Sequence, residues 1–151
     1  STAEIETFLV DNAASKDVAV GGYAAYEVSF TLKPQFEGKT KVTLCNACGE
    51  KFSLEFDTEN MTVLADRSES GKMTRIKSFV LMPAAPLGLC NSSDGYDVDV
   101  FVDKCSVEVF VDGGRIAMTN LVFPSESFDN IVFESTGESE ISNMFIHKIG
   151  K

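Results

Sequence analysis

The sequence predicts an all-β protein folded as a β-sandwich of two mainly antiparallel sheets. Two observations carry this prediction. Apolar and polar residues alternate with a period of two along several short segments, as in strands that bury one face and expose the other to water. Turn-forming residues separate these segments at short intervals, which is typical of sandwiches. Sustained 3.6-residue periodicity, the mark of an amphipathic helix, is missing from the sequence.

The predicted strands can be placed one by one. Alternation is clearest over residues 26–32, 52–57 and 97–102. Further apolar runs, each predicted as a strand, lie at 40–45, 61–65, 76–82, 106–111, 115–123, 130–134 and 141–149. Turn residues separate them at Thr58-Glu59-Asn60, Ser70-Gly71, Ser93-Asp94-Gly95, Asp112-Gly113-Gly114 and Thr136-Gly137. The expected core includes Phe30, Phe52, Leu54, Phe56, Val100, Val107, Val109 and Phe133.

The length of 151 residues suits a single domain with one hydrophobic core. Residues 1–22 are expected to be a linker or lead-in from a preceding domain, and residues 23–151 the sandwich itself. Within the lead-in, residues 3–10 fit either a helical turn or a strand. The longest apolar stretch, at 79–90, contains two prolines and is far shorter than the roughly 20 residues that span a bilayer.

The charge balance bears on the choice of partners. Thirteen Lys and Arg against twenty-three Asp and Glu give a net charge of -10, which repels nucleic acid and acidic membrane surfaces. We therefore expect neither as a partner. The acidic residues are best explained as a solvated exterior.

Two polar segments interrupt the apolar pattern. The first, Asp66-Arg67-Ser68-Glu69-Ser70-Gly71, follows a predicted strand and places a carboxylate and a guanidinium on adjacent residues. The second is a predicted hairpin of strands 98–102 and 106–111 around the turn Asp103-Lys104-Cys105. Glu108 then points away from the core face. From spacing alone, a turn Asp with a surface Arg and a solvated Glu remain the simpler interpretations.

The same two segments resemble the signature of the C-terminal domain of glycoside hydrolase family 32. That domain carries Asp-Arg-Ser-x-Ser-Gly, matched here from Asp66 to Gly71, and Val-Asp-x-Ser-Ser-Val-Glu-Val-Phe, matched at 102–110 with Cys105 replacing a Ser. An Asp-Gly turn at 112–113, a Thr at 119 and Phe123-Pro124 follow in the family's order. The similarity runs from about Tyr26 to Ile149.

The resemblance implies a sandwich of the concanavalin A-like lectin type. It also implies a non-catalytic accessory domain that packs on and stabilises the catalytic propeller of a levanase, fructanase or invertase. Such enzymes are secreted, periplasmic or bound to the cell surface, and in some members the sandwich contributes to a homodimer. The family's Asn-Asp-Pro-Asn, Arg-Asp-Pro and Glu-Cys catalytic motifs are absent from this sequence. We therefore expect no hydrolysis by this chain alone, because glycoside hydrolysis needs two positioned carboxylates.

Two other functions stay open at this point. The related family 66 carbohydrate-binding modules bind the terminal fructose of levan, and a lectin-like adhesion domain is a further alternative. If the chain binds fructan, the resemblance favours Asp66, Arg67, Asp103 and Glu108, since carboxylates and Arg suit vicinal hydroxyls. The chain has no Trp, so a tyrosine (Tyr23, Tyr26 or Tyr96) or a Phe would have to stack on the sugar.

Metal and cofactor signals are weak, and we expect neither. Cys45 and Cys48 lack a second Cys or His pair at similar spacing, so a local disulfide or two unreactive thiols fit better than zinc. The spacing of Asp97 and Asp99 fits the wet face of one strand better than a calcium site. His147, the only histidine, is expected on an exposed strand rather than as a general base.

Overall fold

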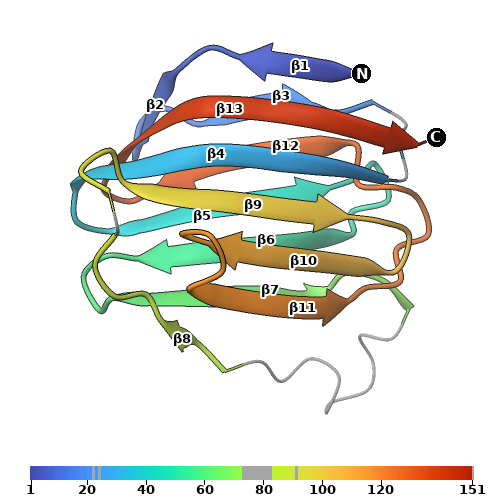
Figure 1. Ribbon diagram of the computed structural model, residues 1–151. Coiled ribbons are helices and arrows are strands. Elements are labelled where there is room, and N and C mark those ends of the chain that lie inside the picture. The colour runs from blue at the N-terminus through green and yellow to red at the C-terminus, as the bar shows by residue number, and fades with distance from the viewer. Residues whose placement is uncertain (22, 24, 73–82, 91, 151) are drawn as a thin grey trace.

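Two antiparallel sheets pack face to face in the computed structural model, which describes residues 1–21, 23, 25–72, 83–90 and 92–150 (Figure 1). The first sheet has the order β1 (Thr2–Ile5), β13 (Glu138–Gly150), β4 (Ala25–Phe36), β9 (Tyr96–Val102), β10 (Ser106–Val111), β11 (Ile116–Leu121), with β2 (Phe8–Asp11) also paired to β13. The second has the order β3 (Lys16–Ala19), β12 (Asn130–Ser135), β5 (Lys39–Cys45), β6 (Lys51–Asp57), β7 (Thr62–Glu69), β8 (Ala85–Pro86). The predicted β-sandwich is confirmed.

The period-two pattern decides which side chains enter the core. In β10, Val107, Val109 and Val111 are buried, whereas Glu108 and Phe110 between them are half-buried on the outer face. All eight residues expected in the core are buried. Edge-to-face ring contacts join the two sheets, because Phe30 of β4 and Phe133 of β12 lie with ring centroids 5.4 Å apart.

The N-terminal segment is part of the sandwich. Residues 1–22, expected as a linker or lead-in, supply β1 and β2 to the first sheet and β3 to the second. These strands are only four residues long, and each buries at most one side chain, so their alternation is too short to stand out in the sequence. The strand predicted at 76–82 lies outside the described residues. The two-residue β8 was not predicted.

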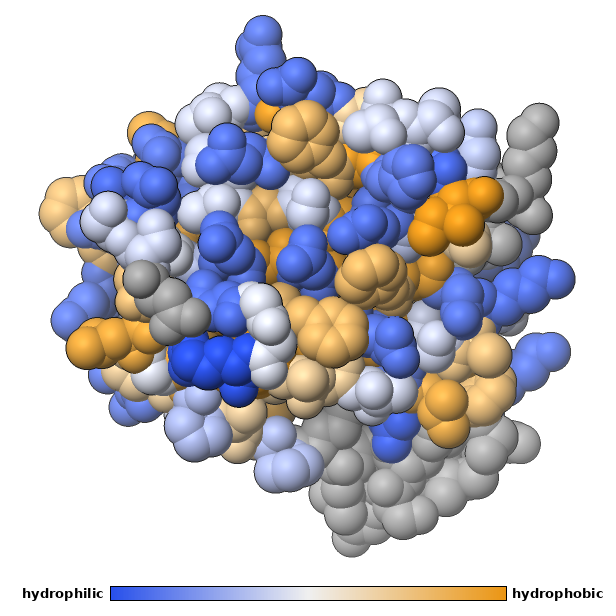
Figure 2. All heavy atoms as spheres, viewed as in Figure 1, coloured by the Kyte–Doolittle hydropathy of each residue, from blue (hydrophilic) through white to orange (hydrophobic). Residues whose placement is uncertain are grey.

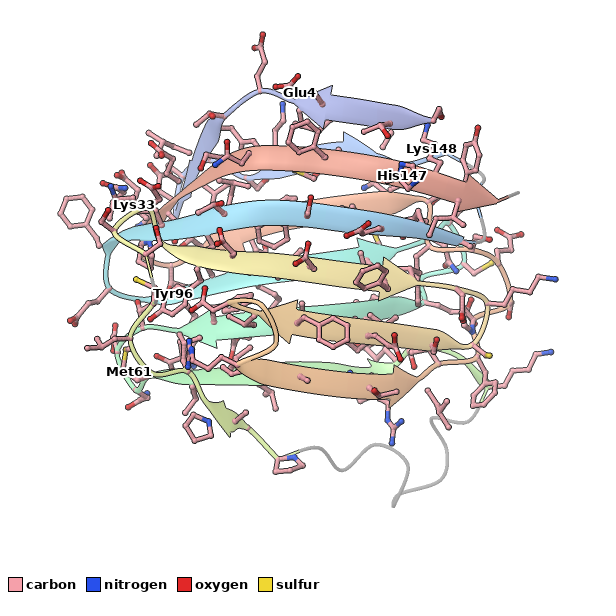
Figure 3. All side chains as sticks on the ribbon, in the orientation of Figure 1. Glu4, Lys33, Met61, Tyr96, His147 and Lys148 are labelled. Carbon is pink, nitrogen blue, oxygen red and sulfur yellow. The ribbon has the colours of Figure 1, made fainter. Side chains whose placement is uncertain are left out.

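The two ends of the chain lie side by side. β1 runs antiparallel to β13, and the backbone N–H of Lys148 donates a 2.8 Å hydrogen bond to the carbonyl of Ser1. Figure 3 shows His147 and Lys148 on this part of β13, and Nδ1 of His147 lies 2.7 Å from Oγ1 of Thr2. His147 is thus an exposed strand residue, as predicted. In the part of the chain that is described, no helix is long and apolar enough to cross a membrane.

Candidate carbohydrate-binding site

The segment Asp66–Gly71 forms the last four residues of β7 and the turn that follows them. Oδ1 of Asp66 accepts a 2.8 Å hydrogen bond from the N–H of Ser68, and the buried Ser70 donates its hydroxyl to the carbonyl of Arg67 at 2.7 Å. The N–H of Lys72 then bonds the carbonyl of Phe123 at 3.2 Å. The two motif-bearing regions of the sequence therefore meet in space, although about fifty residues separate them.

Arg67 and Asp66 point to opposite sides of β7. Ala65 is buried, so Arg67, two residues on, faces inward at the open edge of the sandwich, and the exposed Asp66 lies on the outer face of the second sheet. Nη1 of Arg67 donates a 3.2 Å hydrogen bond to the carbonyl of Leu121 on β11. The contact spans the gap between the edges of the two sheets.

A cleft of about 250 Å³ lies beside Arg67. Its described lining comes from β7, β8, β11 and the segment just before β8, namely Ala65, Arg67, Pro83, Ala85, Met118, Thr119 and Asn120. Asn120 is only 5% exposed, and its Nδ2 has no hydrogen-bond partner among the described residues. A buried amide without a partner is costly, and such groups are rare in folded proteins. Asn120 and Met118 were missed as site residues, although an Asn at an inward position of a strand is a signal the sequence contains.

Asp103 sits in the β9–β10 turn, as predicted. Its Oδ1 accepts hydrogen bonds from the N–H groups of Cys105 at 2.9 Å and Ser106 at 2.8 Å. Hydrogen bonding, led by the Cys105 backbone, holds the pKa of Asp103 below its usual value despite some desolvation. The carboxylate is thus used to build the turn.

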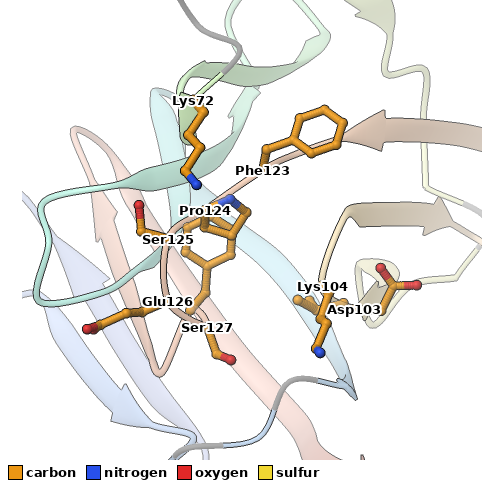
Figure 4. A pocket seen from close by; sticks show the side chains of 10 residues that line it. Lys72, Asp103, Lys104, Phe123, Pro124, Ser125, Glu126 and Ser127 are labelled. Atoms are coloured by element: carbon orange, nitrogen blue, oxygen red, sulfur yellow. The ribbon is translucent and has the colours of Figure 1, made fainter.

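Asp103 also lines a second hollow, of about 430 Å³, at the end of the sandwich (Figure 4). Lys72 and Lys104 reach it from different segments, and residues 123–128 form its floor. Glu50 holds this floor by accepting hydrogen bonds from the N–H and hydroxyl of Ser125, at 2.8 and 3.0 Å. Burial raises the pKa of Glu50, but these bonds and one from Asn46 outweigh it and leave the pKa lowered.

Glu108 lies on the outer face of the first sheet. Its register partners are Phe101 on β9 and Thr119 on β11. Thr119 also lines the Arg67 cleft. Glu108 is therefore paired with a residue of that cleft, although it does not line the cleft itself. Asp66 lies on the opposite outer face, and Asp103 lines the other hollow. The four candidate residues therefore do not converge on one site.

Two of the three tyrosines considered for stacking are unsuited to it. Tyr26 is fully buried, and Tyr96 is 4% exposed with its hydroxyl bonded to the carbonyl of Gly88 at 2.7 Å. Both positions fall on inward faces of their strands, which the alternation implies. Tyr23 is half-buried, and Nζ of Lys148 lies 4.8 Å from its ring centroid.

The cysteines and acids form no metal site within the described ranges. All four cysteines are free, so Cys45 and Cys48 make no local disulfide. No group of three or more His, Cys, Asp or Glu is placed to hold an ion among residues 1–72 and 83–150, apart from the gaps stated above. Asp97 and Asp99 lie on the outer face of β9, as their spacing predicts.

Comparison with known proteins identifies relatives. Residues 1–148 match the model of the family described as glycosyl hydrolases family 32 C terminal. The chain is 27% identical over 131 residues to a levanase of Bacillus subtilis, covering 84% of this chain and 19% of that protein. It is 30% identical over 95 residues to an extracellular exo-inulinase of Aspergillus niger, covering 62% of this chain and 18% of that protein. The chain therefore spans about a fifth of the length of these curated relatives.

A solved structure shares the fold. The β-fructofuranosidase of Schwanniomyces occidentalis, in complex with fructosyl-erythritol, matches with a TM-score of 0.81 at 18% identity. The match covers the whole of this chain and 33% of that one.

Proposed function

Because the chain belongs to the C-terminal domains of glycosyl hydrolases family 32, we propose that it is the non-catalytic accessory domain of an enzyme that cleaves fructans or sucrose. The observation that carries this proposal is the family match over nearly the whole chain, together with coverage of only about a fifth of a levanase. The remainder of such a relative has room for a separate catalytic domain. We further propose that the enzyme acts outside the cell, since one relative is an extracellular exo-inulinase.

A non-catalytic role is supported by how the candidate acids are used. Glycoside hydrolysis needs a pair of carboxylates about 5 to 9.5 Å apart on either side of the scissile bond. Asp66 and Asp103 instead accept hydrogen bonds from backbone N–H groups two residues on, and Asp66 and Glu108 lie on opposite outer faces. The domain's contribution would be to pack on a catalytic domain of the same chain and stabilise it.

The accessory role can be tested on the full-length protein that the gene of this chain encodes. The full-length protein should contain a catalytic domain with the family's paired carboxylates. The 151-residue chain alone should release no fructose from levan, inulin or sucrose. Deleting these residues from the full-length protein should lower its melting temperature. Hydrolysis by the isolated chain, or an unchanged melting temperature after the deletion, would contradict the accessory role.

Fructan binding is a second candidate function, favoured by the Arg67 cleft. The guanidinium of Arg67 is a donor for sugar oxygens, Met118 adds an apolar wall, and the buried amide of Asn120, without a partner among the described residues, lies behind them. Glu108, next to Thr119, would accept from a sugar hydroxyl at the rim. Asp66 and Asp103 have no place in this smaller site.

Calorimetric titration with levan, inulin and fructose tests this candidate. Saturable heat with a fructan should vanish in Arg67→Ala and weaken in Glu108→Ala. It should persist in Lys41→Ala and Glu55→Ala, which remove charges from the second sheet. No heat at millimolar ligand, or heat that survives Arg67→Ala, would remove the cleft as a fructan site.

A further inference from the structure

The outer face of the first sheet carries a row of side chains that no function described so far uses. Strand register places Phe145 of β13 beside Ser29 of β4, Ser29 beside Asp99 of β9, and Asp99 beside Phe110 of β10. The row crosses four neighbouring strands, a span of about 14 Å at ordinary strand spacing. Figure 2, which looks onto this face, shows hydrophilic side chains interleaved with hydrophobic ones.

The face is hollowed in the middle of this row. The hollow has a volume of about 430 Å³, and its lining includes Ser29, Thr31, Asp97, Asp99, Asn143 and Phe145. Small residues form its floor because Ser29 and Thr31 project little from β4. A bulge in β13 between Ser142 and Phe145 puts Asn143, with a φ of 50°, at the rim. The volume falls in the range of small-ligand sites.

The two carboxylates in the hollow differ in their use. Asp97 accepts a 2.9 Å hydrogen bond from the hydroxyl of Thr31. Asp99 is half-buried, and its carboxylate makes no hydrogen bond or ion pair with any described residue. Burial, and secondarily the charge of Asp97, raise the pKa of Asp99, so its carboxylate is poorly solvated where it stands. A ligand hydroxyl that donated to Asp99 would relieve this cost.

Aromatic rings flank the carboxylates on both sides. Phe145 is 39% exposed and forms one wall of the hollow. On the other side the half-buried rings of Phe101 and Phe110 meet edge to face, with centroids 5.8 Å apart. An apolar ring beside carboxylate and hydroxyl acceptors suits a molecule with C–H faces and many hydroxyls. This combination is what a sugar presents.

We propose that the hollow binds one unit of a neutral oligosaccharide, with Asp99 and Asp97 accepting from its hydroxyls and Phe145 packing against its ring. The chain of sugars then runs along the row toward Phe101 and Phe110. Anionic ligands are disfavoured by the two carboxylates and the net charge of -10. Calcium prefers several carboxylate ligands, whereas the hollow has only Asp97 and Asp99, and no group of three or more His, Cys, Asp or Glu is placed to hold an ion among the described residues. The site does not use Arg67 and shares no lining residue with the Arg67 cleft.

The experiment is a titration of the ¹⁵N-labelled chain, followed by amide chemical shifts. The probes are levan oligosaccharides, inulin oligosaccharides and maltohexaose, each up to about 10 mM. Shifts should appear in β4, β9 and β13 around the hollow. Asp99→Ala should raise the Kd about tenfold or more, because a hydrogen bond to a charged group is lost. Phe145→Ala should raise it roughly threefold to tenfold.

Matched variants separate the site from the rest of the molecule. Glu55→Ala removes an acid from the opposite outer face, and Phe36→Ala removes a more exposed Phe at the end of β4. Both should bind as the unmodified chain does. Asp99→Asn keeps the shape of the side chain, so weakened binding with an unchanged melting temperature excludes misfolding as the cause.

Three outcomes would overturn the proposal. These are no shifts with any probe, binding unchanged in both Asp99→Ala and Phe145→Ala, or binding abolished by Arg67→Ala but not by Asp99→Ala. The last outcome would locate the sugar in the cleft instead, so failure of the hollow is distinguishable from failure of fructan binding.

Discussion

The hydroxyl of Tyr26 donates a 2.7 Å hydrogen bond to the carbonyl oxygen of Phe128, 102 residues along the chain. Tyr26 is a fully buried residue of β4 in the first sheet, and Phe128 lies two residues before β12 of the second. The bond therefore links the first sheet to the loop that lines the hollow shown in Figure 4. Burial is the main cause that raises the pKa of Tyr26, so the hydroxyl stays protonated and remains a donor.

Replacing Tyr26 with Phe should destabilise the domain by about 1–3 kcal/mol, because the carbonyl of Phe128 loses its partner in a buried setting. Urea unfolding followed by circular dichroism measures the change. Tyr23→Phe is the matched control, since that half-buried tyrosine should change stability by less than about 0.5 kcal/mol. Equal effects of the two substitutions would show that the Tyr26 hydroxyl contributes nothing.

Gly71 allows the end of the β7 turn to touch the Phe123–Pro124 backbone. A Cβ added at Gly71 would lie 2.0 Å from the carbonyl oxygen of Phe123. Gly71 also has a positive φ of +143°. Gly71→Ala should therefore cost about 2 kcal/mol or more in the free energy of unfolding. Gly113→Ala separates clash from backbone strain, because Gly113 has a φ of +69° and nothing within 4 Å of a Cβ. A Gly71→Ala variant no less stable than Gly113→Ala would contradict the close contact.

Asp103 should make stability depend on pH. Hydrogen bonds lower its pKa in the folded chain, so its stabilising contribution is present above the unfolded value of about 3.9 and is lost as pH falls through the lower folded value. Asp103→Asn keeps an oxygen acceptor but cannot titrate. Denaturant unfolding between about pH 5 and pH 2 should show a smaller loss of stability in this variant. Parallel curves for the two proteins would rule the effect out.

Glu126 should slow the alkylation of the Cys48 thiol. Desolvation and the nearby Glu126 carboxylate raise the pKa of Cys48, which is exposed, and the thiolate is the reactive form. Glu126→Gln should speed alkylation of Cys48 by iodoacetamide several-fold at pH 7, as measured by peptide mass spectrometry. The exposed Cys105 lies in a different turn and serves as the internal reference. Unchanged labelling of Cys48 would remove the role of Glu126.

The fold was predictable wherever one strand face is consistently apolar. Phe52, Leu54 and Phe56 alternate with polar residues along β6, so burial of this set follows from the pleat alone. The Asp103 turn was predictable because its flanking strands have unbroken alternation. β1, β2 and β3 were not, since four residues give too few alternations and their partners lie at the far end of the chain.

The candidate site was less predictable, because the local alternation of apolar and polar residues does not determine which strands become neighbours in space. Arg67 reaches Leu121 only because β7 and β11 end up on the same side of the sandwich. Asp66 and Glu108 come from the motifs of one family signature, yet period two sends them to opposite outer faces. Asp99 and Phe145 are 46 positions apart in sequence and were not connected by any motif.

The adjacency of Ser1 and Lys148 makes this fold suited to circular permutation. A short flexible linker between the present ends would replace the contact that β1 and β13 already make. New ends opened between Gly113 and Gly114, in the exposed turn between β10 and β11, would interrupt no strand pairing. Because its two ends are neighbours, the domain could also be inserted into a surface loop of another protein, with both junctions close together.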